Sequence, residues 1–286
     1  MAEALGTMTA FAEIPVADAE PDILDIYQRL MSAAGSGSPA LIFRHLAVTP
    51  GLLNWVWRAI GADAEAGWVR DAVWRIVAEM APVAIDPITP AVLSDTGIDR
   101  DARRQTGDML TSYNRMNPVN LILMGAVRVL ISGAEPTASV GAYVMEPSSP
   151  PIAPPDLPPP PAVASLNPDL QAAIRALCVT IPDVGAEVTP TLYRHFAIWP
   201  RFMMTVAERL NPSLDALNEA TLSLNDACAP LIEQVAERAR ERVSEPPPIT
   251  NQVILLRVLD GFSYVIPHLV VVGQAIEAAL PGEMPE

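Results

Sequence analysis

The chain has 286 residues, and its 33 acidic side chains outnumber 18 basic ones, giving a formal net charge of -15 and a pI of about 4.5. An acidic surface repels phosphate backbones and anionic lipids, so the composition argues against a nucleic-acid partner and a membrane partner. Half of the residues are apolar and 18% are charged, which is typical of a globular protein with a large core.

The N-terminal residues and the two cysteines bear on location. Residues 1–22 carry acids early and lack the basic stretch of a secretory signal. Apolar runs break off well before the roughly 20 residues that a membrane span needs. Cys178 and Cys228 lie far apart and form no CxxC pair, which argues against a thiolate zinc cluster. We therefore expect a soluble, cytoplasmic protein.

Amphipathic helices are predicted along the first half of the chain. Pro21 suits the first turn of a helix. One face of that helix carries four apolar residues: Ile23, Ile26, Tyr27 and Leu30. Helical spacing of apolar residues recurs at 53–60 and 69–80, and residues 118–130 form a very apolar helix that begins at Pro118.

An Asn-Pro pair at the start of this apolar helix has two interpretations. Asn117 can cap the helix with Pro118 at its first position, as the pairs beginning at Asn167 and Asn211 can. Alternatively, Asn117 belongs to a polar group beside a helix that is too apolar to face solvent. The other members of that group are Tyr113, Asn114 and Asn120.

A proline-rich segment follows near the middle of the chain. Nine of the fifteen residues from Pro147 to Pro161 are proline. Such a run stays in extended polyproline II conformation and is predicted to act as a semi-rigid tether between two parts of the chain.

The second half repeats the first. Residues 43–50 read FRHLAVTP and residues 193–200 read YRHFAIWP, which gives four identities at an offset of 150 residues. A helix opening at Pro168, helical spacing over 217–231 and an apolar helix over 267–279 complete the second half. The sequence therefore predicts an all-α protein with two homologous helical repeats, residues 13–134 and 166–281. A linker over 135–165 joins them into an intramolecular pseudo-dimer, with a pocket between the halves.

Two histidines occupy equivalent positions of the repeat. His45 and His195 either face one central cavity as acid, base or ligand, or each donates to a backbone carbonyl of its own half. The second interpretation is favoured because paired metal sites usually have carboxylate support. His268 is a weaker candidate of the same kind. The neighbouring Arg44 and Arg194 can hold a substrate carboxylate or form ion pairs at the surface.

These features together are similar to a known family. The duplicated (F/Y)RH element, the segment 113–118 (YNRMNP) and the proline-rich tether resemble the group I 2-haloacid dehalogenases, over residues 13–280 approximately. The half-repeat is in turn similar to the alkylhydroperoxidase-D-like helical fold, whose redox members need a CxxC that this chain lacks. The resemblance implies hydrolysis of small 2-haloalkanoic acids by an activated water, without a metal or organic cofactor and without a covalent ester.

The resemblance also assigns site residues, and one assignment fails. Asn117 falls where the family has the Asn that orients the water. The catalytic Asp of the family corresponds to Leu192, which cannot accept a proton, although Thr191 keeps the preceding hydroxyl. Asp183 or Glu187 would have to replace this base. The rest of the pocket implied by the resemblance comprises Ser38, Leu41 and Tyr113, with large rings expected in place of the first two.

Three function hypotheses remain open. The first is a diverged, cofactor-independent dehalogenase that acts on a small carboxylic acid. The second is a non-catalytic protein that binds an apolar small molecule on the same scaffold. The third is another lyase or hydrolase that uses His45 and His195. Whatever the function, His45, His195, Asn120 and His268 are candidates for the polar lining of the pocket. We expect no metal site, no nucleic-acid partner and no membrane partner, and either a monomer or a homodimer.

Overall fold

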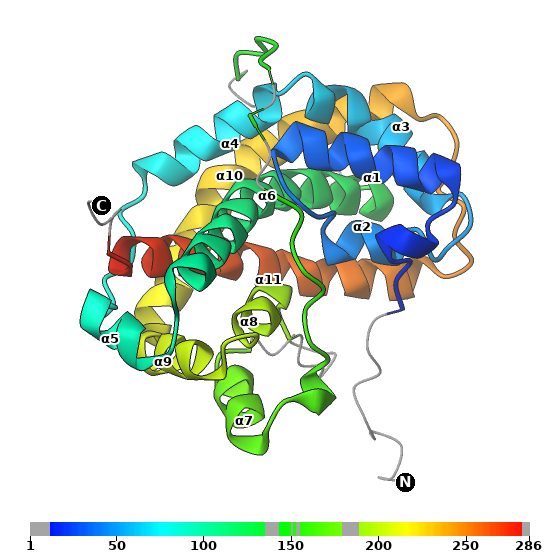
Figure 1. The fold of residues 1–286 in the computed structure, drawn as a ribbon. Coiled ribbons are helices and arrows are strands. Elements are labelled where there is room, and N and C mark those ends of the chain that lie inside the picture. Colours follow the sequence, from blue (N-terminus) through cyan, green and yellow to red (C-terminus); the bar gives the residue numbers. More distant parts are fainter. Residues whose placement is uncertain (1–11, 135–142, 150, 153–154, 179–188, 282–286) are drawn as a thin grey trace, which may run out of the picture.

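The structure is a computed structural model that describes residues 12–134, 143–149, 151–152, 155–178 and 189–281. Every regular element in these ranges is helical, and no β-strand occurs in them (Figure 1). The prediction of an all-α fold is confirmed.

The first half contains six α-helices and one short 3-10 turn in the described residues. They are η1 (Val16–Asp18), α1 (Pro21–Ala34), α2 (Leu41–Leu46), α3 (Leu52–Glu65), α4 (Trp68–Glu79), α5 (Pro90–Asp95) and α6 (Arg100–Ser132). As predicted, Pro21 starts α1 and its four apolar residues are buried. Gly35 ends α1 in the left-handed conformation, with φ of 62°.

The second half contains helices in a similar order. They are η2 (Val163–Ser165), α7 (Pro168–Ala176), α8 (Thr191–Phe196), α9 (Pro200–Leu210), η3 (Asn211–Ser213), α10 (Leu214–Arg242) and α11 (Gln252–Ala279). Asn167 caps α7 as predicted, because its side chain accepts a hydrogen bond from the Leu170 amide. Helices α2 and α8 carry the duplicated motif. Helices α6 and α11 are the last helices of the first and second halves.

Two predicted helix starts and two predicted caps are wrong. Pro118 lies inside α6 and Pro267 lies inside α11, so Asn117 does not cap a helix. Asn211 follows α9 and opens only the short turn η3. An interior proline costs a helix one hydrogen bond and about 3 kcal/mol. Both prolines are buried, so apolar packing around α6 and α11 offsets this cost.

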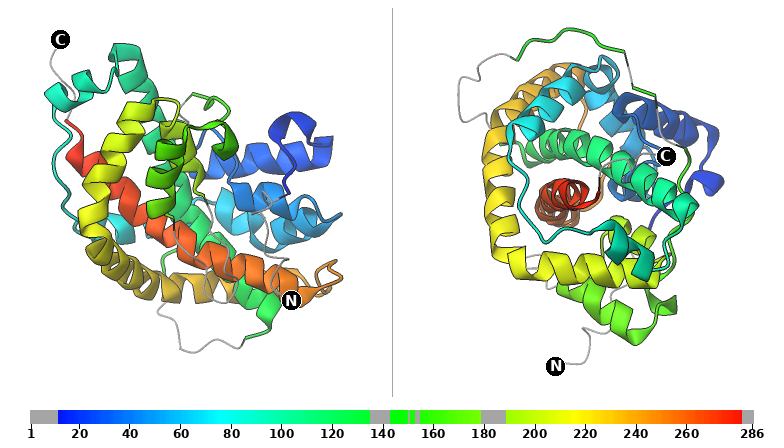
Figure 2. Two further views of the ribbon diagram at one scale, coloured as in Figure 1. Left: turned by 90° about the horizontal axis from the view of Figure 1, so that it is seen from below. Right: turned by 60° about the vertical axis from the view of Figure 1, so that its left-hand side comes forward.

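The two halves share one core. Helix α6 packs along α11 and α10, and α10 also contacts α3 and α4. The right-hand view of Figure 2 shows α11 nearly end-on in the middle of the molecule, with other helices around it. Helix α11 is long and apolar enough to span a membrane by length and composition, but these contacts are those of a core helix.

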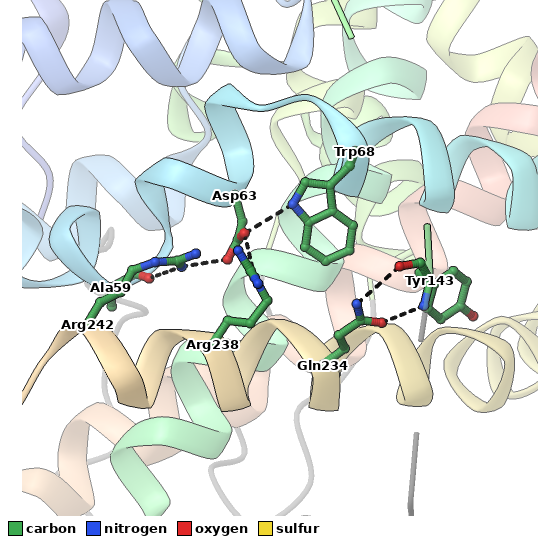
Figure 3. Close-up of polar contacts among 7 residues, drawn as sticks. All are labelled: Ala59, Asp63, Trp68, Tyr143, Gln234, Arg238 and Arg242. Atoms are coloured by element: carbon green, nitrogen blue, oxygen red, sulfur yellow. Dashed lines mark hydrogen bonds and ion pairs between the residues drawn. The ribbon is translucent and has the colours of Figure 1, made fainter. Parts of the chain in front are cut away.

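A buried ion cluster joins the halves on the side of α10 (Figure 3). Asp63 on α3 is 1% exposed and accepts hydrogen bonds from Arg238 at 2.9 Å, Arg242 at 2.5 Å and the Trp68 indole at 3.1 Å. Burial acts to raise the pKa of Asp63, but the hydrogen bonds from the two arginines outweigh it and the pKa is lowered.

The proline-rich segment is bound to the helices and is not a free spacer. Arg70, itself buried, donates to Ser148 and to the Ser149 carbonyl, and Arg115 donates to the Ile152 carbonyl at 2.7 Å. Just before this segment, Gln234 on α10 pairs with both backbone groups of Tyr143. The described parts of this segment run across the molecule from beside α4 to beside α7 (Figure 1).

Candidate functional site

A cavity of about 440 Å³ lies between the two halves. Its volume falls within the range of about 300–1,000 Å³ that is usual for small-molecule sites. Both halves line it, together with residues 157–160 of the proline-rich segment. A single chain therefore builds the whole cavity, in the place that the sequence predicts for a pocket.

The two long helices give this cavity a polar wall and an apolar wall. Helix α6 contributes Tyr113, Met116, Asn117 and Asn120. Helix α11 contributes Phe262, Val265, Ile266 and Leu269. The second set follows the first at a constant offset of 149 residues. Positions of α6 and α11 that lie 149 residues apart in the sequence thus face the same space, with Tyr113 and two amides on the α6 side and only apolar side chains on the α11 side.

The cavity brings together eight of the residues singled out from the sequence. These are Ser38, Leu41, Arg44, Tyr113, Asn117, Asn120, Thr191 and His195. Others are not among its lining residues. Leu192 is fully buried beside Thr191, His268 is buried between α11 and α10, and His45 is partly buried. Asn114 bonds Glu277, and Arg194 bonds the proline-rich segment. The two substitute bases, Asp183 and Glu187, lie outside the described residues.

The two amides on the α6 wall lack partners. Asn117 is 6% exposed, and its Nδ2 is buried without a hydrogen bond in the described part of the chain. Asn120 is 3% exposed, and its side chain makes no hydrogen bond to a described residue. Buried amides normally find partners. Both side chains line the cavity, so a ligand is the natural partner.

A hydrogen-bonded chain connects the cavity to the proline-rich segment. The Pro158 carbonyl can only accept, so His195 Nε2 carries the proton and donates to it at 2.8 Å. His195 Nδ1 is then an acceptor, and the Tyr113 hydroxyl donates to it at 2.7 Å. Burial lowers the pKa of His195 and raises that of Tyr113, so both are neutral at pH 7.

Two guanidinium groups give this end of the cavity a positive potential. Arg44 lines the cavity and pairs with Glu13 at 3.0 Å, both side chains being partly buried. Arg194 donates to the carbonyls of Pro161 at 3.0 Å and Pro160 at 3.4 Å. Both charges oppose the rise in the pKa of Tyr113 and add to the fall in that of His195.

The structure does not pair the two imidazoles of the repeat in one cavity. His45 Nδ1 lies 2.8 Å from the Ala12 carbonyl, which matches the structural interpretation of this residue. His268 faces Thr221 at 3.5 Å, and burial lowers its pKa. His195 combines the two interpretations of the repeated histidines, because it donates to a backbone carbonyl and also lines the cavity.

Some lining residues carry no recognisable signal in the sequence. Ser36 and Ser112 form a hydroxyl pair 3.0 Å apart at the cavity edge, and no motif marks them. The α11 wall could have been predicted from the offset between the two halves. Each of its four lining positions follows one of the four α6 positions by 149 residues. In the described residues, no group of three or more His, Cys, Asp or Glu could hold a metal.

Three comparisons place the fold. No protein-family model matches the chain, and no curated protein matches it. A solved D-2-haloacid dehalogenase in complex with L-LA aligns with a TM-score of 0.70 and 17% identity, over 95% of this chain and 97% of that one. The chain has the fold of the D-2-haloacid dehalogenases.

Two further dehalogenase structures agree with this fold. A mutant in complex with D-2-CPA has a TM-score of 0.65 at 17% identity, covering 93% of this chain and 96% of that one. Another mutant has a TM-score of 0.70 at 18% identity, covering 95% and 96%. Likeness at this identity establishes the fold alone, and the chemistry depends on the residues of the cavity.

Proposed function

We propose that the cavity binds a small carboxylic acid, and that the protein retains the dehalogenase scaffold as a binding site. The supporting observation is the combination of Arg44, a cavity-lining cation that pairs with Glu13, with the unpartnered amide nitrogen of Asn117 and no Asp or Glu among the described lining residues. The protein as a whole carries a charge of -15, so a locally positive cavity is a distinctive place for an anion.

The charges and hydrogen-bond donors suit a carboxylate. A guanidinium binds a carboxylate more strongly than it binds a neutral group, and Arg194 adds to the potential at the same end. Glu13 holds Arg44 in the free protein. A ligand carboxylate can share or replace that contact, while its apolar part packs against Phe262 and Ile266 on the α11 wall.

The described cavity lacks a group that could activate water. Leu192 occupies the position that the resemblance assigns to the catalytic carboxylate, and it is fully buried. Both ring nitrogens of His195 are engaged in hydrogen bonds, and burial lowers its pKa. A general base needs a free acceptor within hydrogen-bond reach of the water. These points favour binding over hydrolysis.

The test is calorimetric titration of the protein with hexanoate and with hexanamide, which differ in charge and share the apolar chain. A hydrogen bond to a charged group contributes about 1.5–3 kcal/mol, so hexanoate is expected to bind about tenfold or more tightly. Equal affinity for the acid and the amide would show that the guanidinium end does not recognise a carboxylate.

Hydrolytic dehalogenation is the second candidate function. It is favoured by the position of Asn117, whose free Nδ2 lines the cavity. The base would be Asp183 or Glu187. Halide release from D- and L-2-chloropropionate, measured for the unaltered protein, Asn117→Ala, Asp183→Asn and Glu187→Gln, decides it. Turnover that is lost in Asn117→Ala and in one carboxylate variant would establish this function, and no release from the unaltered protein would exclude it for this substrate.

A further inference from the structure

The polar side chains on the α6 wall form a column rather than a patch. Tyr113, Asn117 and Asn120 follow one another at intervals of four and three residues, so they lie on one face of the helix. With a rise of 1.5 Å per residue, Tyr113 and Asn120 are about 10 Å apart along the helix axis. The positive end of the cavity is at Tyr113, and the two amides lie beyond it.

The amides set a condition on the ligand. In an empty cavity, solvent can serve the polar atoms of Asn117 and Asn120. A ligand that displaces solvent without reproducing its hydrogen bonds leaves buried polar groups unpaired and loses affinity. The tail of a simple fatty acid would do this, because its far end is apolar. The opposite wall, with Ile266 and Leu269, offers these amides no hydrogen-bonding group.

A ligand with two polar ends satisfies the whole cavity. Its carboxylate would lie near Arg44, Tyr113 and Thr191, and its apolar middle would pack against the α11 wall. A hydroxyl, carbonyl or amide at its far end would reach the two asparagines. A hydroxyl can accept from the free Nδ2 of Asn117 and donate to the amide oxygen of Asn120.

We propose that the ligand of this cavity is a carboxylic acid that carries a second hydrogen-bonding group remote from its carboxylate. This inference rests on the proposed function, namely that the positive end of the cavity binds a carboxylate. It adds that Asn117 and Asn120 together select the far end of the ligand.

The experiment compares the dissociation constants of hexanoate, 6-hydroxyhexanoate and 2-hydroxyhexanoate by calorimetry. The terminal hydroxyl is expected to tighten binding about threefold to tenfold over hexanoate, which is the usual effect of one or two neutral hydrogen bonds. The hydroxyl of 2-hydroxyhexanoate lies beside the carboxylate and is expected to give no such gain. This ligand series needs no altered protein.

A matched pair of variants locates the effect. Asn120→Leu introduces the side chain that Leu269 has at the equivalent place, and it is expected to abolish the preference for 6-hydroxyhexanoate over hexanoate. Asn54→Leu makes the same change on α3, where Asn54 bonds Asp22 outside the cavity, and should keep the preference.

The outcomes separate the two proposals. If hexanoate binds as tightly as 6-hydroxyhexanoate, the remote group is not recognised and this inference is wrong, while carboxylate binding stands. A preference that persists in Asn120→Leu also overturns the assignment of the far end to the asparagines. If none of the three acids binds, both the inference and the proposed function fail.

Discussion

His195 is held in one tautomer by its neighbours, and this fixes which of its ring nitrogens donates and which accepts a hydrogen bond at this end of the cavity. The Pro158 carbonyl takes the Nε2 proton, and Nδ1 accepts from Tyr113. The sequence does not predict the hydrogen bond between Tyr113 and His195, because the two residues come from different halves and their contact depends on the tertiary fold. The duplicated Arg-His pair drew attention to His195 as one of two equivalent histidines, and the sequence left open whether either one faces a cavity.

The first prediction concerns the Tyr113 hydroxyl. Tyr113→Phe leaves His195 Nδ1, in a side chain 3% exposed, without its hydrogen-bond donor. The free energy of unfolding should fall by about 1–3 kcal/mol, as measured by urea denaturation. Tyr264→Phe removes the same hydroxyl from a ring that is 47% exposed and serves as the control. Equal stability of Tyr113→Phe and the unaltered protein would argue against this hydrogen bond.

At the scale of the elements, amphipathic spacing predicted the helices well but misplaced two of their starts. The buried faces of α1, α3, α7 and α10 follow the apolar periodicity of the sequence. Pro118 and Pro267 were interpreted as helix starts because proline is favourable at the first helical position. Local propensity does not predict that α6 and α11 continue past their prolines. They do so because α6 packs against α11 and α10.

The proline-rich segment is the other element whose role depends on the fold. Its composition predicted an extended tether, and the structure shows that residues 157–160 also form a wall of the cavity. Arg194 and His195 of α8 hold this wall through backbone carbonyls. Such contacts to a backbone leave no residue-type signal in a sequence.

The second prediction tests this anchoring. Arg194→Met removes the hydrogen bonds to Pro160 and Pro161 and should loosen the wall. Hydrogen exchange of the nearby amides of Ser165 and Leu166, which bond the carbonyls of Ala162 and Val163, is expected to accelerate, because local opening becomes easier. Arg104→Met, which alters an exposed pair with Asp101, is the matched control. Unchanged exchange in Arg194→Met would indicate that the wall is held by packing alone.

At the scale of the whole molecule, the halves are joined by a shared core and by the buried carboxylate of Asp63. Asp63 on α3 faces Arg238 and Arg242 on α10, so this charge cluster crosses from one half to the other. The resemblance in the sequence predicted the overall fold, which the structural comparisons confirm. The cluster itself was not predicted, because one Asp among 33 acidic residues has no distinguishing spacing.

The third prediction concerns this cluster. Asp63→Asn leaves two partly buried guanidiniums uncompensated and should lower the free energy of unfolding by about 3–5 kcal/mol. Asp101→Asn, in an exposed pair, should change it little. The folded-state pKa of Asp63 is lowered, so its contribution is complete above the unfolded pKa and is lost as pH falls through the folded value. The difference between the two proteins should therefore shrink below pH 3.8, and a difference that grows there would contradict this account.

The central claim is that the positive end of the cavity holds a carboxylate, and the ion pair between Arg44 and Glu13 offers a direct test. Hexanoate is titrated calorimetrically into the unaltered protein, Arg44→Gln and Glu13→Gln. We predict weaker binding in Arg44→Gln, because the cation is lost, and tighter binding in Glu13→Gln, because the competing carboxylate is lost. If both variants bind hexanoate as the unaltered protein does, the carboxylate does not bind at Arg44 and the central claim is wrong.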